Sequence, residues 1–144
     1  MSAVDIAAEF IKAHEGLRLT AYKDIGGVLT IGYGHTGSDV KVGAIWDQSQ
    51  VDKALKTDLQ IAFNAVKSYT KVPLSDKQAA ALTSFVFNLG QGAFRSSTLL
   101  IVVNNKDWIG SAKELIRWDK VGGEEVKGLL IRRLEEAALF LRGS

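Results

Sequence analysis

The stretch EGLRLTAYKDIGGVLTIGYGHT, residues 15–36, decides how the N-terminal part of this chain is expected to fold. At its centre, the dipeptide Gly26-Gly27 suits the positive φ angles of a tight hairpin turn. Residues 28–33, which follow the turn, are rich in β-branched side chains and end in glycines, as is typical of a strand. A hairpin turned at this point would place Asp24 and Thr30 on neighbouring strands.

A helix is expected immediately before this stretch, over residues 5–14. Apolar side chains such as Ile6 and Phe10 recur there at helical spacing, with charged residues on the other face. Glu15 would then lie at the C-terminal end of the helix, where the negative end of the helix dipole disfavours a charged carboxylate. Facing the hairpin, Glu15 would lie across a cleft from Asp24.

Downstream of residues 37–46, which predict an irregular segment that closes a small β-rich lobe, the pattern becomes helical. Two capping boxes, beginning at Asp47 and Ser75, each precede a long apolar pattern. The second opens a run over residues 79–89 that is apolar on nearly every side, which predicts a buried central helix. Further helices are expected after Ser96 or Ser97, after Asp107, and from Gly128 to Arg142, the last burying Leu129, Leu130, Leu134, Leu139 and Phe140.

These patterns predict an α+β fold in one continuous unit. Residues 1–46 would form the N-terminal helix and the small β-rich lobe that carries the candidate catalytic residues, and residues 47–144 a linking helix and an all-helical lobe. A length of 144 residues is enough for one compact domain or two tightly packed lobes.

The composition excludes several classes of function. The chain has no cysteine and two histidines, so a disulfide framework, a thiolate metal site or a zinc site is hard to build. A net charge of +2 is far from that of a nucleic-acid-binding protein, although it mildly favours anionic surfaces such as a bacterial envelope polymer. No apolar run is long enough for a membrane span, and the N-terminus lacks the pattern of a signal peptide. We therefore expect neither a cofactor nor stable membrane insertion.

Two carboxylates in different environments are what glycoside hydrolysis requires. One acid protonates the leaving oxygen, and the other stabilises the developing positive charge and directs a water or attacks directly. Glu15 and Asp24 could supply this pair, and a hydroxyl such as that of Thr30 could help to hold the water. The same spacing also fits a helix-end glutamate and a turn-flanking aspartate that are both simply solvated.

The whole stretch resembles the phage-type lysozymes, the muramidases of glycoside hydrolase family 24. The resemblance covers nearly the whole chain, with the motifs in the family's order. The matching elements are Glu15-Gly16, Arg18, Ala21-Tyr22, Asp24, Gly27, residues 30–36 (TIGYGHT), residues 84–90 (SFVFNLG), Phe94, residues 97–100 (STLL), Trp118, and Gly128-Leu129 followed by Arg132-Arg133 and Glu136.

The resemblance implies a lysozyme-like fold with the active-site cleft between the two lobes. It implies that Glu15 is the general acid, Asp24 the second catalytic carboxylate, and Thr30 the residue that positions water with Asp24. Family members hydrolyse the β-1,4 bond between N-acetylmuramic acid and N-acetylglucosamine in peptidoglycan without a cofactor. A water-directing mechanism of this kind is expected to place the carboxyl groups roughly 6.5–9.5 Å apart and to invert the anomeric configuration.

Several other residues are assigned supporting positions. Thr36, Phe87 and Ser97 align with residues that line the cleft in relatives. His35 is expected to support the site through a hydrogen bond to backbone or to a carboxylate, and Arg18 to pair with Glu15 or Asp24. A further set, Arg132-Arg133 with Glu135-Glu136, is interpreted as a solvated helix face with local ion pairs. The sequence offers no account of Trp46.

We therefore expect an endolysin that degrades the bacterial cell wall as a monomer. It would be made in the host bacterial cytoplasm and would reach the wall through a holin-type pore, because the apolar signal-anchor segment of some relatives is missing. Two alternatives stay open. A lytic transglycosylase would cleave the same bond with one acid and no directed water, and a catalytically silent module would only bind peptidoglycan.

Overall fold

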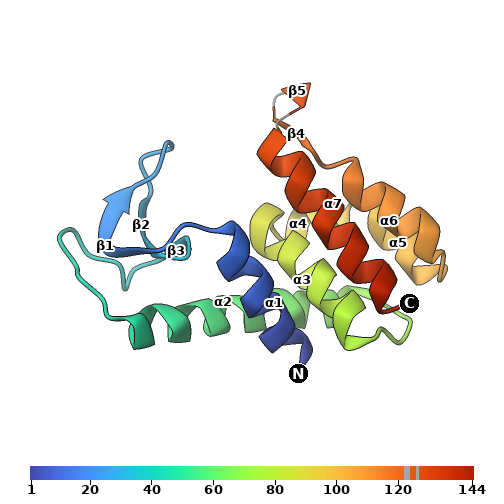
Figure 1. The fold of residues 1–144 in the computed structure, drawn as a ribbon, viewed down its shortest axis with the longest axis horizontal. Helices are drawn as coiled ribbons and strands as arrows, with labels where there is room; N and C mark the ends of the chain where they lie inside the picture. The colour runs from blue at the N-terminus through green and yellow to red at the C-terminus, as the bar shows by residue number, and fades with distance from the viewer. Residues whose placement is uncertain (122–123, 126) are drawn as a thin grey trace.

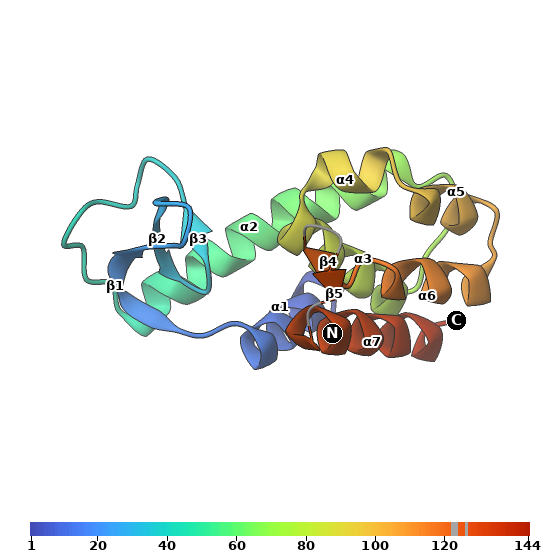
Figure 2. The same cartoon turned by 90° about the horizontal axis from the view of Figure 1, so that it is seen from above.

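In the computed structural model, which describes residues 1–121, 124–125 and 127–144, a small sheet and a body of helices form two lobes (Figure 1). One long helix runs beneath both of them, and the view from above shows the sheet at one end of that helix and most other helices at the opposite end (Figure 2). The predicted α+β class, with a small N-terminal β lobe and a larger helical lobe, is confirmed.

The first helix, α1 (Ala3–His14), begins two residues earlier than predicted, because Ser2 caps it and accepts a hydrogen bond from the Asp5 backbone N–H. Its buried side chains pack against α2 (Gln48–Tyr69) and α3 (Asp76–Leu89) of the helical lobe. At Glu15 the backbone leaves the helix in an extended conformation, with ψ at 139°. The last residue before the β lobe is thus a glutamate anchored to a helix that belongs, by packing, to the other lobe.

The sheet contains β1 (Arg18–Lys23), β2 (Leu29–Gly32) and β3 (His35–Thr36), paired antiparallel in that order. The predicted hairpin is present: Asp24 and Val28 close the turn through a backbone hydrogen bond of 2.9 Å, and Gly27 adopts a φ of +80°. Thr30 lies on β2 opposite Tyr22. Asp24 lies just past the end of β1, so it belongs to the turn and not to a strand.

The irregular segment after β3 runs back along the free edge of β1. Thr20 and Ile45 form an isolated bridge, and the Trp46 backbone N–H donates to the Leu19 carbonyl at 2.8 Å. The Trp46 ring lies beside the His35 ring, 5.6 Å between centroids, and packs against the core. Trp46, which the sequence left unexplained, therefore closes the β lobe onto the start of the next helix.

That helix, α2 (Gln48–Tyr69), and the buried α3 (Asp76–Leu89) both begin with the predicted capping boxes, at Asp47 and Ser75. All residues from 78 to 86 on α3 are buried, which confirms the central helix. It is surrounded by α1, α2 and the last helix, α7 (Lys127–Arg142). The core of the protein therefore lies in the helical lobe, and α2 extends from it to carry the sheet.

The remaining elements are short except for the last helix. They are α4 (Gln91–Arg95), α5 (Thr98–Asn104), α6 (Trp108–Ile116), β4 (Lys120–Val121), β5 (Glu124–Glu125) and α7 (Lys127–Arg142). Neither α4 nor the β4–β5 pair was predicted from the sequence. The dipeptide Gly122-Gly123, which predicts a break before the last helix, lies outside the described residues. No helix among the described residues has the length and apolar character that a bilayer crossing requires.

The buried face of α7 differs from the prediction. Leu134, expected in the core, is 45% exposed, whereas Leu139 and Phe140 are buried as predicted. The prediction that the charged residues within 132–136 form a solvated face is wrong in part, because three of these side chains are buried: Arg132, Arg133 and Glu136. The helix therefore turns a charged stripe toward α3, and apolar residues alone did not reveal its orientation.

Candidate active site

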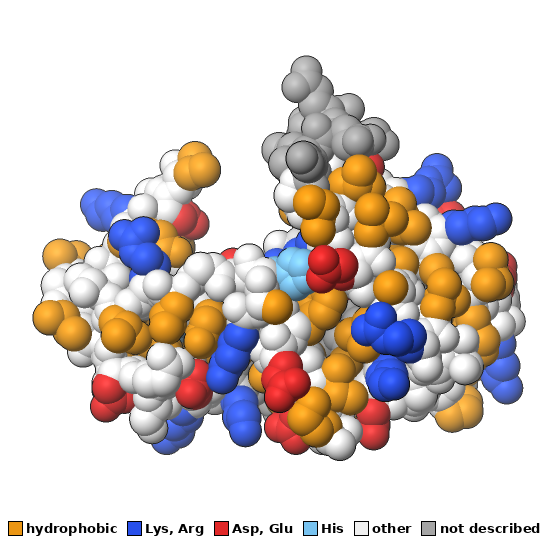
Figure 3. Space-filling model, viewed as in Figure 1, with side chains coloured by type: hydrophobic (Ala, Val, Ile, Leu, Met, Phe, Trp, Pro, Cys, Tyr) orange, Lys and Arg blue, Asp and Glu red, His pale blue; other side chains and the backbone are white. Residues whose placement is uncertain are grey.

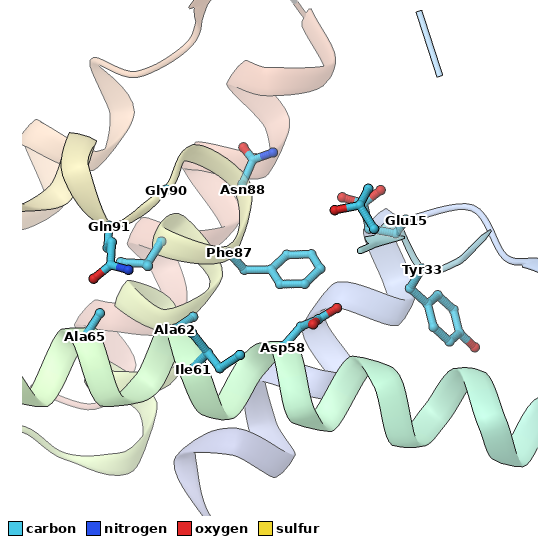
Figure 4. A pocket seen from close by; sticks show the side chains of 13 residues that line it. Glu15, Tyr33, Asp58, Ile61, Ala62, Ala65, Phe87, Asn88, Gly90 and Gln91 are labelled. Carbon is cyan, nitrogen blue, oxygen red and sulfur yellow. The ribbon is translucent and has the colours of Figure 1, made fainter. Parts of the chain in front are cut away.

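A cleft of about 440 Å³ lies where the β lobe meets the helical lobe. The space-filling view shows the molecule hollowed between the two lobes (Figure 3). Three side chains project toward the same space (Figure 4): Glu15 at the end of α1, Asp58 on α2 and Phe87 on α3. The full lining consists of Glu15, Tyr33, Gly34, Thr36, Asp58, Ile61, Ala62, Ala65, Val86, Phe87, Asn88, Gly90 and Gln91.

Glu15 stands at the wall of this cleft with its side chain 30% exposed. Its Oε1 accepts a hydrogen bond of 2.8 Å from Nη1 of Arg132, whose side chain is 7% exposed. Such a charge-assisted contact fixes the carboxyl group in direction as well as in position. The cation beside Glu15 thus comes from α7, whereas Arg18, which was expected to pair with an acid, lies over the Tyr22 ring with its guanidinium 4.3 Å from the ring centroid.

Behind Arg132 lies a buried polar cluster that joins α7 to α3. Glu136 accepts hydrogen bonds from the Ser84 hydroxyl, at 2.5 Å, and from Nη2 of Arg133, at 3.0 Å. The same Nη2 also donates to the Asn88 side chain at 2.9 Å. Since Asn88 and Glu15 both line the cleft, the cluster runs from one wall of the cleft through the interior to the other.

Asp24 and Thr30 lie together on the hairpin of the β lobe. The exposed Asp24 carboxylate accepts a 2.9 Å hydrogen bond from the Val28 backbone N–H through Oδ1. Thr30 is buried, at 4% exposure for the whole residue, and its hydroxyl donates to the Val28 carbonyl at 2.9 Å. Val28 therefore orients both side chains, although neither of them lines the 440 Å³ cavity.

His35 connects the β lobe to the long helix. Its Nδ1 lies 2.7 Å from Oδ2 of Asp58 on α2, and its Nε2 lies 3.0 Å from Asp39 in the following loop. Because each ring nitrogen faces a carboxylate, both must carry a proton, which is the imidazolium form. The predicted contact of His35 with a carboxylate is present, and one of its partners, Asp58, also lines the cleft.

The pKa values within this cluster are shifted in opposing directions. Burial alone would lower the pKa of His35, but the hydrogen bonds to Asp58 and Asp39 outweigh it and raise that pKa above 6.5. The pKa of the exposed Asp39 is lowered by its hydrogen bond to His35. Burial raises the pKa of Asp58 against the influence of His35. Burial favours a neutral Asp58, whereas the 2.7 Å contact with the His35 ring is that of an ion pair.

The three residues that the sequence analysis assigned to the cleft lining lie in different places. Thr36 and Phe87 line the cleft. Ser97 does not: it is 6% exposed, its hydroxyl donates to the Phe94 carbonyl, and it caps α5 by accepting from the Leu100 N–H. The hydroxyl of Ser97 therefore has a structural role, as the cap of α5.

Sequence reasoning missed Arg132, Glu136 and Asp58 as parts of the site. The first two belong to the motif that follows Gly128, and two arginines spaced three or four residues from a glutamate within that motif were a usable signal. Asp58 falls between Leu55 and Ala62 at helical spacing, so it is an acid on the buried stripe of α2. No group of three or more histidine or acidic side chains in the described part of the chain is arranged to hold a metal ion.

Comparison with known proteins yields consistent matches. Residues 12–136 match the model of the family described as phage lysozyme. The chain is 41% identical over 129 residues to the SAR-endolysin of Bacteriophage PS119, covering 90% of this chain and 77% of that protein. It is 39% identical to the endolysin of Bacillus phage B103 over 99% of this chain, and it spans about half, 55%, of that relative's length.

A solved structure gives the same result for the fold. The crystal structure of a mutant of P22 lysozyme superposes with a TM-score of 0.88 and 39% identity, covering 98% of this chain and 99% of that one. The predicted lysozyme-like fold is therefore confirmed.

Proposed function

This chain belongs to the phage lysozyme family and is a muramidase-type glycoside hydrolase, and we propose that Glu15, Asp24 and Thr30 carry out its reaction. The substrate is bacterial peptidoglycan, and the bond cleaved is the β-1,4 linkage between N-acetylmuramic acid and N-acetylglucosamine. The observation that supports these roles best is the position of Glu15 at the junction of both lobes, on the wall of the cleft.

Glu15 is proposed as the general acid that protonates the leaving glycosidic oxygen. It is fixed at the end of α1 and directed by the 2.8 Å contact with Arg132. Its side chain keeps 30% exposure on the cleft side, so the carboxyl group is accessible to a bound sugar. A positioned acid of this kind typically contributes about 10²–10⁴-fold to the rate.

Asp24 and Thr30 are proposed to hold the attacking water. The Thr30 hydroxyl uses its proton on the Val28 carbonyl, so its oxygen is left to accept a hydrogen bond. The Asp24 carboxylate also accepts. A water that donates one proton to each of them keeps a lone pair directed at the anomeric carbon, which is the geometry that a single displacement needs. As its oxygen bonds to that carbon, the water gives one proton to the Asp24 carboxylate, and the bond to the leaving oxygen, protonated by Glu15, breaks. This mechanism inverts the configuration at that carbon.

The cleft between the lobes suits a polysaccharide strand. Phe87 offers an aromatic face, while Thr36 and Asn88 offer polar groups for hydroxyl and acetamido substituents. The net charge of +2 favours the anionic cell wall. In this proposal the protein acts as a monomer, is made in the host bacterial cytoplasm, and lyses the host after release through a holin-type pore.

The test of the proposed acid is Glu15→Gln, which keeps the size of the side chain and removes its acidity. We expect release of fragments from purified peptidoglycan to fall to background while circular dichroism and the melting temperature show an intact fold. Glu114→Gln is the matched control, because it breaks a contact of 3.0 Å with Arg117 away from the cleft lining and should leave the rate unchanged. Activity near wild type in Glu15→Gln would refute the assignment.

A further inference from the structure

The carboxylate of Glu136 lies behind Arg132, the cation that Glu15 contacts, and no step of the proposed reaction uses it. Glu136 on α7 is 0% exposed. A buried charge is unfavourable unless it is paired, and buried ion pairs are often replaceable by apolar side chains without loss of stability. Stability alone is therefore a weak reason for a glutamate at this position.

Among the described residues, the hydrogen-bond and ion-pair partners of the Glu136 carboxyl are all donors. The Ser84 hydroxyl and Nη2 of Arg133 donate to Oε2, Nε of Arg133 lies 2.7 Å from Oε1, and Nε of Arg132 lies 3.6 Å from Oε2. This surrounding is that of a carboxylate. Burial raises the pKa of Glu136, and the charges of Arg133 and Arg132 and the Ser84 hydroxyl act against that shift.

The same contacts fix the long side chain of Arg132. Its Nε faces Glu136, its Nη2 lies 3.4 Å from the Ser84 hydroxyl, and its Nη1 donates to Glu15. Two hydrogen bonds, to Glu15 and Ser84, and the 3.6 Å ion pair with Glu136 restrict the rotamers of Arg132. The buried groups behind Arg132 therefore help to set the place where it presents Nη1. Displacing Glu136 would release that end of the side chain.

We propose that Glu136 is a positioning residue for the reaction: through Arg132 it holds the Glu15 carboxyl group in its reactive place. It also keeps Arg132 paired with a carboxylate while Glu15 carries the proton that it donates. This inference rests on the proposed role of Glu15 as the acid. Glu136 itself is not among the residues that line the cleft.

Two substitutions separate this role from simple packing. Glu136→Gln keeps the size and loses the charge, whereas Glu136→Asp keeps the charge and leaves a void. We expect kcat on purified peptidoglycan fragments to fall by about tenfold or more in Glu136→Gln, with KM within about twofold of wild type, because misplacing a reacting group slows the chemical step. Glu136→Asp should retain a higher kcat than Glu136→Gln, although it fits the space less well.

The controls separate loss of positioning from loss of stability. Leu115→Ala empties a buried site on α6 outside the charged cluster and should lower the melting temperature without lowering kcat per folded molecule. If neither Glu136 variant folds, Ser84→Ala replaces them, since it removes one contact from Glu136 and one from Arg132. Its kcat should fall several-fold with KM unchanged.

The outcomes that refute this inference are distinct from those that refute the proposed function. An active wild type whose kcat is unchanged in Glu136→Gln, or in Ser84→Ala where that variant is needed, removes Glu136 from the mechanism. A higher kcat in Glu136→Gln than in Glu136→Asp also refutes the positioning role, because activity would then follow the size of the side chain and not its charge. A wild type that releases no fragments refutes the proposed function instead.

Discussion

At the scale of single residues, His35 gives the clearest dependence on pH. Its pKa is raised above 6.5 in the folded protein by Asp58 and Asp39. The stabilisation from this charge is therefore complete below pH 6.5 and is lost as the pH rises through the raised value. The raised pKa of Asp58 changes stability with pH in the same direction, and the pKa of Asp39 is lowered from 3.8, below this range, so neither carboxyl reverses the sign.

The corresponding prediction compares wild type with His35→Gln by urea unfolding between pH 5.5 and 9, roughly one unit below the ordinary histidine pKa to well above it. The difference in unfolding free energy should be largest at the acid end of that range and shrink as the pH rises. A difference that stays flat would mean that the cluster does not hold the imidazolium ion.

Thr30 gives a second prediction at this scale. Thr30→Glu fills the space beside Asp24 with a larger side chain and adds a like charge, so it should block the water site. We expect hydrolysis to fall by about 10²-fold or more, as for other groups that orient a reactant. Hydrolysis is measured as the release of glycan fragments, and binding of the variant to peptidoglycan is measured in parallel. Full hydrolysis by this variant would remove Thr30 from the mechanism.

The site residues that the sequence predicted are those whose role depends on chain neighbours. Asp24 and Thr30 meet at one hairpin, and Glu15 follows directly from a helix end. Arg132 and Glu136 were not predicted as site residues, because their position depends on how α7 is rotated about its axis against α3. That rotation buries charged side chains, although helices usually bury apolar ones. Asp58 was missed because its partner, His35, comes from the other lobe.

At the scale of elements, the junction between α3 and α4 depends on one glycine. Gly90 adopts φ +92° and ψ 154°, a region that other residues avoid, while no atom would obstruct an added Cβ. Gly90→Ala should therefore destabilise the protein by about 1–3 kcal/mol through backbone strain alone.

Gly92, two residues later in α4, is the matched control. Its backbone is helical, and an added Cβ also meets nothing within 4 Å. Gly92→Ala should leave the stability unchanged or raise it by about 0.5–1 kcal/mol. Urea unfolding of both variants tests the pair, and equal losses in the two would show that something other than the φ angle of Gly90 matters.

Helix starts were predictable from the sequence where a side chain caps them. Asp47, Ser75 and Asp107 each cap a helix as expected. The short α4 has no side-chain cap and only five residues, so no local sequence pattern predicted it. Leu134 shows the other limit: at helical spacing it matched the apolar stripe, but the buried charges of α7 set a different face inward.

At the scale of the whole molecule, α2 joins two lobes whose contacts meet at the cleft. Glu15 is anchored to the helical lobe, whereas Asp24 and Thr30 belong to the sheet, and His35 ties the sheet to α2 through Asp58. The proposed acid and the proposed water site are therefore carried by different lobes. Their separation is a property of the tertiary arrangement, which spacing in the sequence could not give.

Digestion of purified peptidoglycan in ¹⁸O-labelled water shows whether a directed water hydrolyses the glycosidic bond. Mass spectrometry of the fragments should show hydrated muramic acid ends that carry one ¹⁸O atom each. Unlabelled anhydro ends would contradict the account, because they would mean that the sugar's own hydroxyl attacked and that Asp24 and Thr30 direct no water.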